Sequence, residues 1–148
     1  MKLSPSFREL LASLSERNVR YLIVGGYAVA YHARPRYTKD IDLWIESEPN
    51  NILRLLEALQ DFGFGSLGLA PEDFASPGQF VQLGYPPNRV DLLTSVPGLT
   101  FEEAWQNRAQ EQLEGIALNL LSKEDLIRAK RAAGRYQDLA DLEILEES

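Results

Sequence analysis

The chain has 148 residues, of which 45% are hydrophobic and 25% charged, and these values predict one domain, residues 1–148, with a sizeable core. Its formal net charge of −7 argues against a protein whose main task is to coat nucleic acid, and the absence of cysteine excludes disulfides and thiolate metal sites. No apolar run approaches the roughly 18 residues of a membrane span, and the N-terminus does not resemble a signal peptide. These features favour a cytoplasmic protein.

The first half of the chain is predicted to alternate helices with strands. Ser4-Pro5 and Pro49 are typical helix starts, and apolar residues recur at helical spacing after each of them. The residue before a proline avoids helical angles, so a helix must end before Arg34-Pro35. In chain order, the predicted elements are a helix from Ser4, a strand at 19–24, a short helix at 26–32, a strand at 40–46 and a helix from Pro49 that ends at Gly63.

The second half is predicted to contain a hairpin and three helices. Thr100 with Glu103, and Ser122 with Asp125, have the spacing of residues that cap helix starts. The predicted elements are a loop at 63–78, strands at 79–85 and 89–94, a helix from Thr100 to about 108, a strand at 116–120, a helix from Ser122 to Gly134 and a helix from Tyr136. This mixture predicts an α+β fold, with a mixed, mostly antiparallel sheet covered by helices.

Two glycines and two aspartates stand near each other in the first half. In Asp40-Ile-Asp42, alternate strand residues point to one face, so the two carboxylates project together. Such a pair repels unless a divalent cation lies between its members, and hard oxygen ligands select Mg²⁺ or Mn²⁺. Gly25-Gly26 lets the backbone pass close to a ligand, and the helix that follows offers free N–H groups to a phosphate. The pattern predicts an NTP bound with its metal.

A third acid lies in the apolar run Val90-Asp91-Leu92-Leu93. Taken alone, such an acid marks an exposed strand face at least as often as a site. Beside an Asp-x-Asp pair it supplies the third carboxylate that two metal ions about 4 Å apart need for phosphoryl chemistry. The hypothesis is that Asp40 and Asp42 bind both metals, while Asp91 binds the second and is a candidate general base.

Other polar and aromatic residues have simpler interpretations. His32, the single histidine, is expected to pack and to hydrogen-bond a loop, and tyrosines 27, 31 and 37 are expected to pack and not to stack on a base. Asp138 and Asp141 are either a metal pair or, as we prefer, helix N-terminal charges paired with Arg135 or Lys130. Basic residues also gather in 34–39 and 123–135, where a solvated helix face explains the second group as well as a binding surface does.

The ordered motifs resemble the polymerase-β nucleotidyltransferase superfamily. Gly-Gly-x-Ala-x-x-x-His at 25–32, Arg-x-Thr-Lys-Asp-Ile-Asp at 36–42 and the segment 130–141 are more narrowly similar to small AbiE-type (AbiEii-like) nucleotidyltransferase proteins. The resemblance implies the fold of that superfamily, with Asp40, Asp42, Asp91 and Lys130 as catalytic residues. It implies a nucleotide-binding set made of Gly25, Gly26, Arg36, Thr38, Lys39, Arg135 and Asp138, with Asp141 in a supporting role.

The function implied by this resemblance is a metal-dependent transfer of an NMP from an NTP to a hydroxyl acceptor. The acceptor is an RNA, such as tRNA, or a protein, with an aminoglycoside as a further candidate, and the protein is expected to be the toxin of a toxin–antitoxin pair. The alternative is a nonenzymatic or degenerate nucleotide-binding module that acts within a heteromer. We therefore expect an antitoxin or a heteromeric partner, and we expect no association with a membrane.

Overall fold

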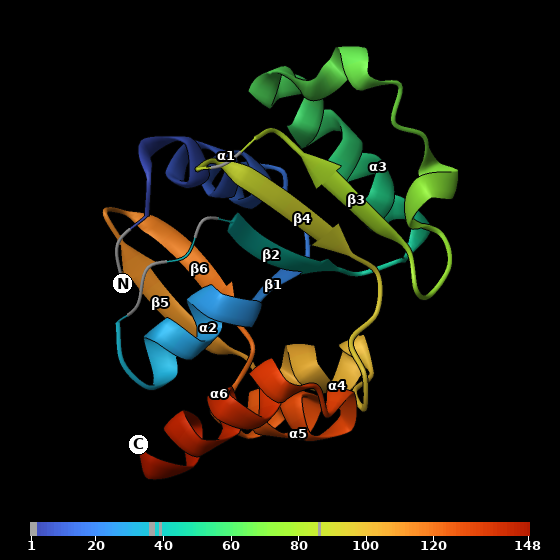
Figure 1. Ribbon diagram of the computed structural model, residues 1–148. Coiled ribbons are helices and arrows are strands. Elements are labelled where there is room, and N and C mark those ends of the chain that lie inside the picture. Colours follow the sequence, from blue (N-terminus) through green and yellow to red (C-terminus); the bar gives the residue numbers. More distant parts are fainter. Residues whose placement is uncertain (1–2, 36–37, 39, 86) are drawn as a thin grey trace.

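The computed structural model describes residues 3–35, 38, 40–85 and 87–148 (Figure 1). Its helices are α1 (Pro5–Glu16), α2 (Gly25–His32), α3 (Pro49–Leu59), α4 (Phe101–Gln106), α5 (Lys123–Ala133) and α6 (Tyr136–Glu147). Its strands are β1 (Tyr21–Val24), β2 (Asp40–Ile45), β3 (Phe80–Leu83), β4 (Arg89–Leu93), β5 (Ala109–Leu113) and β6 (Ile116–Leu120). Within the described residues, no helix is long and apolar enough to cross a bilayer.

The strands form one sheet in the order β3-β4-β2-β1-β6-β5. The pairs β1–β2, β3–β4 and β5–β6 are antiparallel, whereas β1–β6 and β2–β4 are parallel. The predicted α+β fold with a mixed, mostly antiparallel sheet is therefore confirmed. The parallel pairing of β2 with β4 matters most for function, because it sets the two aspartate-bearing strands side by side.

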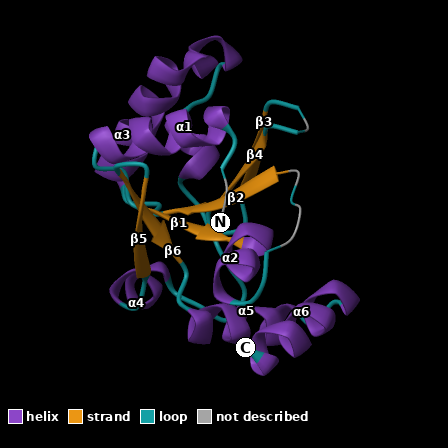
Figure 2. Cartoon of the chain, turned by 90° about the vertical axis from the view of Figure 1, so that its left-hand side faces the viewer, coloured by secondary structure: helices purple, strands orange, loops and turns teal. Residues whose placement is uncertain are grey.

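Helices cover both faces of the sheet (Figure 2). On one face, α1 and α3 pack over a core that includes Ile41 and Leu43 of β2. On the other face, Trp44 of β2 joins a second core with residues of α2, α4, α5 and α6. Successive side chains of β2 point to opposite faces of the sheet and therefore enter different cores, as the sequence pattern predicts. Asp40 and Asp42 share the second face with Trp44, and both remain partly exposed.

Several local predictions need correction. The predicted loop at 63–78 contains short helical turns at Gly65–Leu67 and Pro71–Phe74, because Phe74 is fully buried and anchors the second of them. β5 was not predicted, since it is an edge strand whose residues are half-buried or exposed in alternation and carry little apolar signal. The side chain of Thr100 makes no capping hydrogen bond, so the proposed capping box at α4 is wrong.

The predicted limits of α5 are confirmed. The Ser122 hydroxyl accepts a hydrogen bond from the Asp125 N–H at 3.1 Å, and Gly134 ends the helix in the left-handed region with φ 65°. This tight end allows α6 to fold back against α5. The turn between the two helices brings the basic residues of α5 next to the acidic residues of α6.

Candidate active site

Four charged side chains gather on one face of strands β2 and β4. The register pairs Asp42 with Asp91 and Asp40 with Arg89, so these residues form a square on the sheet. One carboxylate oxygen from each of Asp40, Asp42 and Asp91 lies within 4.8 Å of the other two. The structure thus brings together the three acids that the sequence suggests as metal ligands. They come from residues about 50 positions apart in the chain, so the parallel pairing creates the cluster.

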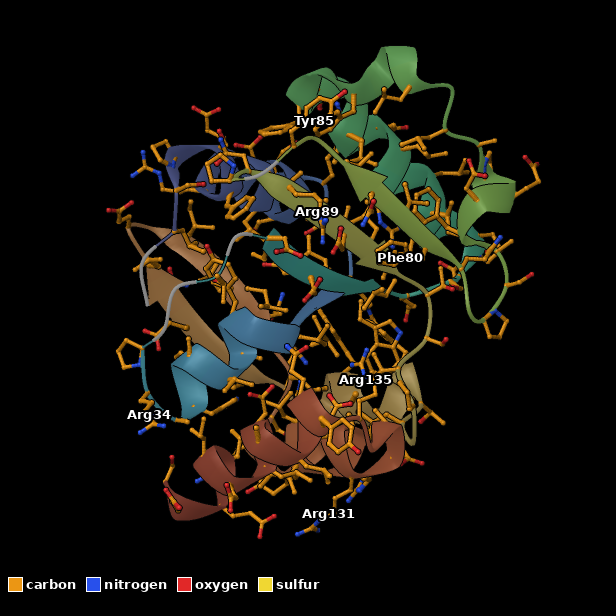
Figure 3. The ribbon with its side chains drawn as sticks, viewed as in Figure 1. Arg34, Phe80, Tyr85, Arg89, Arg131 and Arg135 are labelled. Carbon is orange, nitrogen blue, oxygen red and sulfur yellow. The ribbon has the colours of Figure 1, made fainter. Side chains whose placement is uncertain are left out.

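Arg89 is a member of this cluster that the sequence analysis missed. Its Nη2 donates to Asp40 Oδ2 at 2.7 Å and to Asp91 Oδ2 at 3.2 Å (Figure 3). The available signal was its position two residues before Asp91 on the same strand, which places both side chains on one face. Among the described residues, Arg89 is the cation that forms ion pairs with this cluster, through Asp40 and Asp91.

The titration of Asp42 reflects this crowding. Burial is the first cause that raises its pKa to about 7, and the charges of Asp91 and Asp40 add to the shift, while Lys130 opposes it. Burial also raises the pKa of Asp91, against the lowering effect of Arg89. Both carboxyl groups therefore hold protons more tightly than in water, first because burial disfavours their charged forms.

One oxygen of the cluster lacks a donor from the described chain. Asp91 Oδ1 is buried, and no N–H or hydroxyl group donates to it. The neighbouring Asp91 is one of the causes of the raised Asp42 pKa, after burial. A buried carboxylate oxygen without a donor is unfavourable, and a divalent cation with oxygen ligands would satisfy it. The donor set therefore fits Mg²⁺ or Mn²⁺.

Gly25 leaves room for the Asp42 carboxylate. Its φ is +66°, and a Cβ at this position would lie 2.1 Å from Asp42 Oδ2. Any other residue would both strain the backbone and displace the carboxylate. The close approach expected at Gly25-Gly26 therefore exists, although here it is to an acid of the site. A role of the two glycines in holding a phosphate stays a prediction.

A cavity of about 610 Å³ opens beside the acid cluster. It extends from Gly25 and Asp42 to α5 and the start of α6, and its walls are mainly apolar. Its lining residues are Val24, Gly25, Asp42, Phe80, Leu93, Ser95, Val96, Pro97, Leu121, Leu126, Ala129, Lys130, Ala133, Arg135 and Asp138. Asp42, one of the predicted metal ligands, thus lines the same cavity as three residues of the C-terminal motif. Figure 3 shows Arg135 at the cavity side of α6, facing the sheet.

The C-terminal motif forms an ion-pair cluster between α5 and α6. Lys130 Nζ lies 3.3 Å from Asp138 Oδ1 and 3.0 Å from Asp141 Oδ2. Asp138 also accepts from Arg135 Nε at 2.7 Å and from the Arg135 N–H at 3.1 Å. These bonds from Arg135 are the first cause that lowers the pKa of Asp138, with Lys130 adding to it. The expected salt bridges of Asp138 and Asp141 are confirmed.

The remaining predicted residues lie around these two clusters. His32 Nε2 is 2.7 Å from the backbone oxygen of Leu121, as expected for a packed histidine, and the Tyr31 hydroxyl donates to Glu111 at 2.9 Å. Thr38 is half-buried before β2. Arg36, Tyr37 and Lys39 lie outside the described residues, so the predicted roles of Arg36 and Lys39 in nucleotide binding stay predictions.

The whole chain is similar to known nucleotidyltransferases. The family model "Nucleotidyltransferase of unknown function (DUF6036)" matches residues 2–146, and no curated protein matches. A Thermotoga maritima protein described as a nucleotidyltransferase superposes with a TM-score of 0.61 at 16% identity, covering 96% of this chain and 91% of that chain. The lincomycin-bound lincosamide antibiotic adenylyltransferase LnuA follows with 0.57 at 13% identity, covering 97% and 96%.

The protein ANT(2")-Ia, in complex with adenylyl-2"-tobramycin, gives a TM-score of 0.55 at 18% identity, and the match covers 94% of this chain and 84% of that chain. At these identities the three structures show a shared fold, which matches the sheet and helices described above. The fold, the acid cluster on β2 and β4, and the family model agree on one enzyme class. The chain belongs to the DUF6036 family of nucleotidyltransferases.

Proposed function

We propose that this protein uses Mg²⁺ or Mn²⁺ to transfer an NMP from an NTP to a hydroxyl group, with release of pyrophosphate. The observation that carries the proposal is the cluster of Asp40, Asp42 and Asp91, in which Asp91 Oδ1 is buried without a donor among the described residues and Asp42 lines the cavity of about 610 Å³. Three carboxylates this close together repel each other when no cation is bound, and carboxylates are the ligands that Mg²⁺ and Mn²⁺ prefer. The family model supports the reaction class.

Asp40 and Asp42 would hold both metal ions, and Asp91 would hold the second. Bound metal would neutralise charge on the triphosphate and lower the pKa of the attacking hydroxyl. Asp91 is also the candidate general base, because burial keeps its pKa above the usual range for an aspartate. In the reaction, a bond forms between the acceptor oxygen and the α-phosphorus, the bond to the bridging oxygen breaks, and the hydroxyl proton passes to Asp91.

The cavity would hold the nucleotide. Lys130 and Arg135 line it opposite the acid cluster, and their positive charges are suited to the phosphates and to the charge that develops during transfer. Gly25, Gly26 and the N-terminus of α2 would approach the phosphates, with Thr38, Arg36 and Lys39 completing the set. Asp138 would contribute indirectly, since it holds the side chain of Arg135 through two direct hydrogen bonds.

We further propose that the protein is a cytoplasmic, AbiE-like toxin with an RNA acceptor, such as tRNA. The motifs at 25–32, 36–42 and 130–141 support this assignment. A small-molecule hydroxyl is the second candidate, since two similar structures are described as an antibiotic adenylyltransferase and as a complex with an adenylylated aminoglycoside. The mainly apolar cavity wall and the net charge of −7 favour this second acceptor over a long polyanion.

The test is transfer of label from α-labelled NTPs in the presence of Mg²⁺, offered separately with total RNA, protein, lincosamides and aminoglycosides. Label should enter one acceptor pool, and Asp42→Asn should remove it. Asp61→Asn is the matched control, because Asp61 is an exposed acid that pairs with Arg17 far from the cavity. Nucleotide binding without transfer to any pool would favour the nonenzymatic module instead.

Thermal stability cannot distinguish the transferase from a nonenzymatic nucleotide-binding module. Any ligand that binds the native state stabilises it, by about 2.7 kcal/mol at a hundredfold excess over Kd, whether or not chemistry follows. Growth arrest on induction of the wild type, absent with Asp42→Asn and relieved by a neighbouring gene product, tests the toxin role and the antitoxin partner. If growth is unaffected while label is still transferred, the transferase activity is supported and the toxin role is rejected.

A further inference from the structure

Arg89 is the first residue of β4 and follows the turn of the β3–β4 hairpin. Its side chain is about one-third exposed and reaches over β2, with one nitrogen, Nη2, touching both Asp40 and Asp91. Figure 3 shows Arg89 on β4, at the side of the strand that faces β2. Among the described residues, no other cation makes a recorded ion pair with these two aspartates. Arg89 is therefore built into the cluster from within the sheet.

Arg89 contacts only one oxygen of each of these two carboxylates. Arg89 engages Oδ2 of Asp40 and Oδ2 of Asp91, whereas Oδ1 of Asp91 has no donor from the described chain. Asp42 makes no recorded ion pair with Arg89. A guanidinium that occupied the cation position itself would be expected to contact all three carboxylates. Its position at one side of the cluster instead fixes how two of the carboxylates are turned.

We infer that Arg89 is a positioning residue of the metal site, which orients Asp40 and Asp91 and leaves their other oxygens to the ion. This inference rests on the proposed metal site. A carboxylate held through one oxygen loses its freedom to rotate, so the second oxygen is directed before the ion arrives. Groups that orient metal ligands in this way typically change metal affinity by roughly 10- to 100-fold when they are removed.

Arg89 also lowers the repulsion within the cluster. Asp40 and Asp91 are on adjacent strands, and Arg89 Nη2 lies between their carboxylates, 2.7 Å from Asp40 Oδ2 and 3.2 Å from Asp91 Oδ2. The orientation of the two carboxylates favours the ion, so loss of Arg89 should weaken metal binding even though it removes a positive charge from the neighbourhood.

Mn²⁺ binding to the purified protein, followed by the loss of the free-ion electron paramagnetic resonance signal, tests this role. Arg89→Met should bind Mn²⁺ roughly 10- to 100-fold more weakly than the wild type. Arg89→Lys should recover part of the loss, because a single nitrogen makes both contacts in the native protein. Arg17→Met is the matched control, since Arg17 also bridges two carboxylates, Glu57 and Asp61, but on the surface of α1 and α3.

The unfolding transition of each variant shows whether it is folded, and the Lys variant carries the test if the Met variant is not. Mn²⁺ affinity that is unchanged or higher in Arg89→Met would overturn the inference, because Arg89 would then be neutral or a competitor of the ion. If the wild type binds Mn²⁺ and the Arg89 variants bind it equally well, the proposed metal site is supported and only the role of Arg89 is rejected. If the wild type itself binds no Mn²⁺, both the metal site and the role of Arg89 fail.

Discussion

Two clusters of aspartates among the described residues differ in how their charge is balanced. On β2 and β4, Arg89 pairs with Asp40 and Asp91, and the pKa of the neighbouring Asp42 rises to about 7. Between α5 and α6, Asp138 and Asp141 face Lys130, with Arg135 also bound to Asp138. There the pKa of Asp138 is lowered, first by its hydrogen bond from Arg135.

This difference separates the proposed cation site from a cluster that joins two helices, although Lys130 and Arg135 of the second cluster also line the cavity. The helix cluster is balanced by its own cations and needs no further partner to be stable. In the strand cluster, the charges of Asp91 and Asp40 add to the rise in the Asp42 pKa, and a divalent ion would relieve this repulsion. The acids are aspartates in both places, but the ion pairs of the described residues differ: Arg89 pairs with Asp40 and Asp91, whereas Lys130 and Arg135 both pair with Asp138. Removing a charge should therefore have opposite consequences in the two clusters.

The largest expected effect is on catalysis, in the strand cluster. Asp42→Asn should reduce label transfer by roughly 1,000-fold, because metal ions contribute several kcal/mol to stabilising the transition state. The unfolding free energy of the metal-free protein should stay the same or rise, since the substitution removes repulsion with Asp91 and Asp40. Initial rates and urea unfolding measure the two quantities. A variant that keeps wild-type rates would exclude Asp42 as a metal ligand.

The next effect is on stability, in the helix cluster. Lys130→Met should lower the unfolding free energy by about 3 kcal/mol, because it leaves buried carboxylates without this cation, while Arg135 continues to pair with Asp138. Arg131→Met is the control, since Arg131 also links α5 to α6, through an exposed pair with Glu146, and should cost about 0–1 kcal/mol. Equal losses in the two variants would show that Lys130 is not a structural joint.

Gly25→Ala should disturb the strand cluster without changing its charge. The new Cβ would lie 2.1 Å from Asp42 Oδ2 and would sit on a backbone with φ +66°, so we expect a loss of about 1–3 kcal/mol in stability together with weaker Mn²⁺ binding. Gly68→Ala is matched in φ, at +70°, but its Cβ would meet nothing within 4 Å. Only the Gly25 variant should lose Mn²⁺ affinity, and a loss in both would point to backbone strain alone.

The smallest effect is on the pH dependence of the metal-free protein. The pKa of Asp42 is raised in the folded state, from 3.8 to about 7, so in this window the native state holds a proton that the unfolded chain has released. The Asp42 contribution to stability should therefore decline as the pH rises through this window. Urea unfolding at about pH 5 and about pH 7.5 should show this decline in the wild type and a smaller one in Asp42→Asn.

Added Mg²⁺ should reverse the trend, because only the ionised Asp42 can bind it. Its stabilising effect should be small at the lower pH and should grow as the pH passes about 7. The helix cluster provides the internal contrast, since the lowered pKa of Asp138 confines its titration to lower pH. A Mg²⁺ effect that is independent of pH would argue against Asp42 as the group that exchanges a proton for the metal.

The sequence by itself determined most of the elements and the identity of the three acids. Strand alternation places Asp40 and Asp42 on one face, and capping by Ser122 with a stop at Gly134 sets the limits of α5. These are local properties, because a strand or a helix end depends on residues only a few positions apart. The edge strand β5 escaped prediction for the same reason, since its pairing with β6 and not its own apolar pattern makes it a strand.

Only the tertiary structure decided which acids need a cation and which already have one. The parallel register of β2 with β4 sets Asp91 beside Asp42 and introduces Arg89, and the approach of Gly25 to Asp42 requires a contact between β1–α2 and β2. The turn at Gly134 lets Lys130 meet Asp138 and Asp141. Charge balance is a sum over neighbours in space, so residues with the same letters in the sequence acquire opposite pKa shifts once the chain is folded.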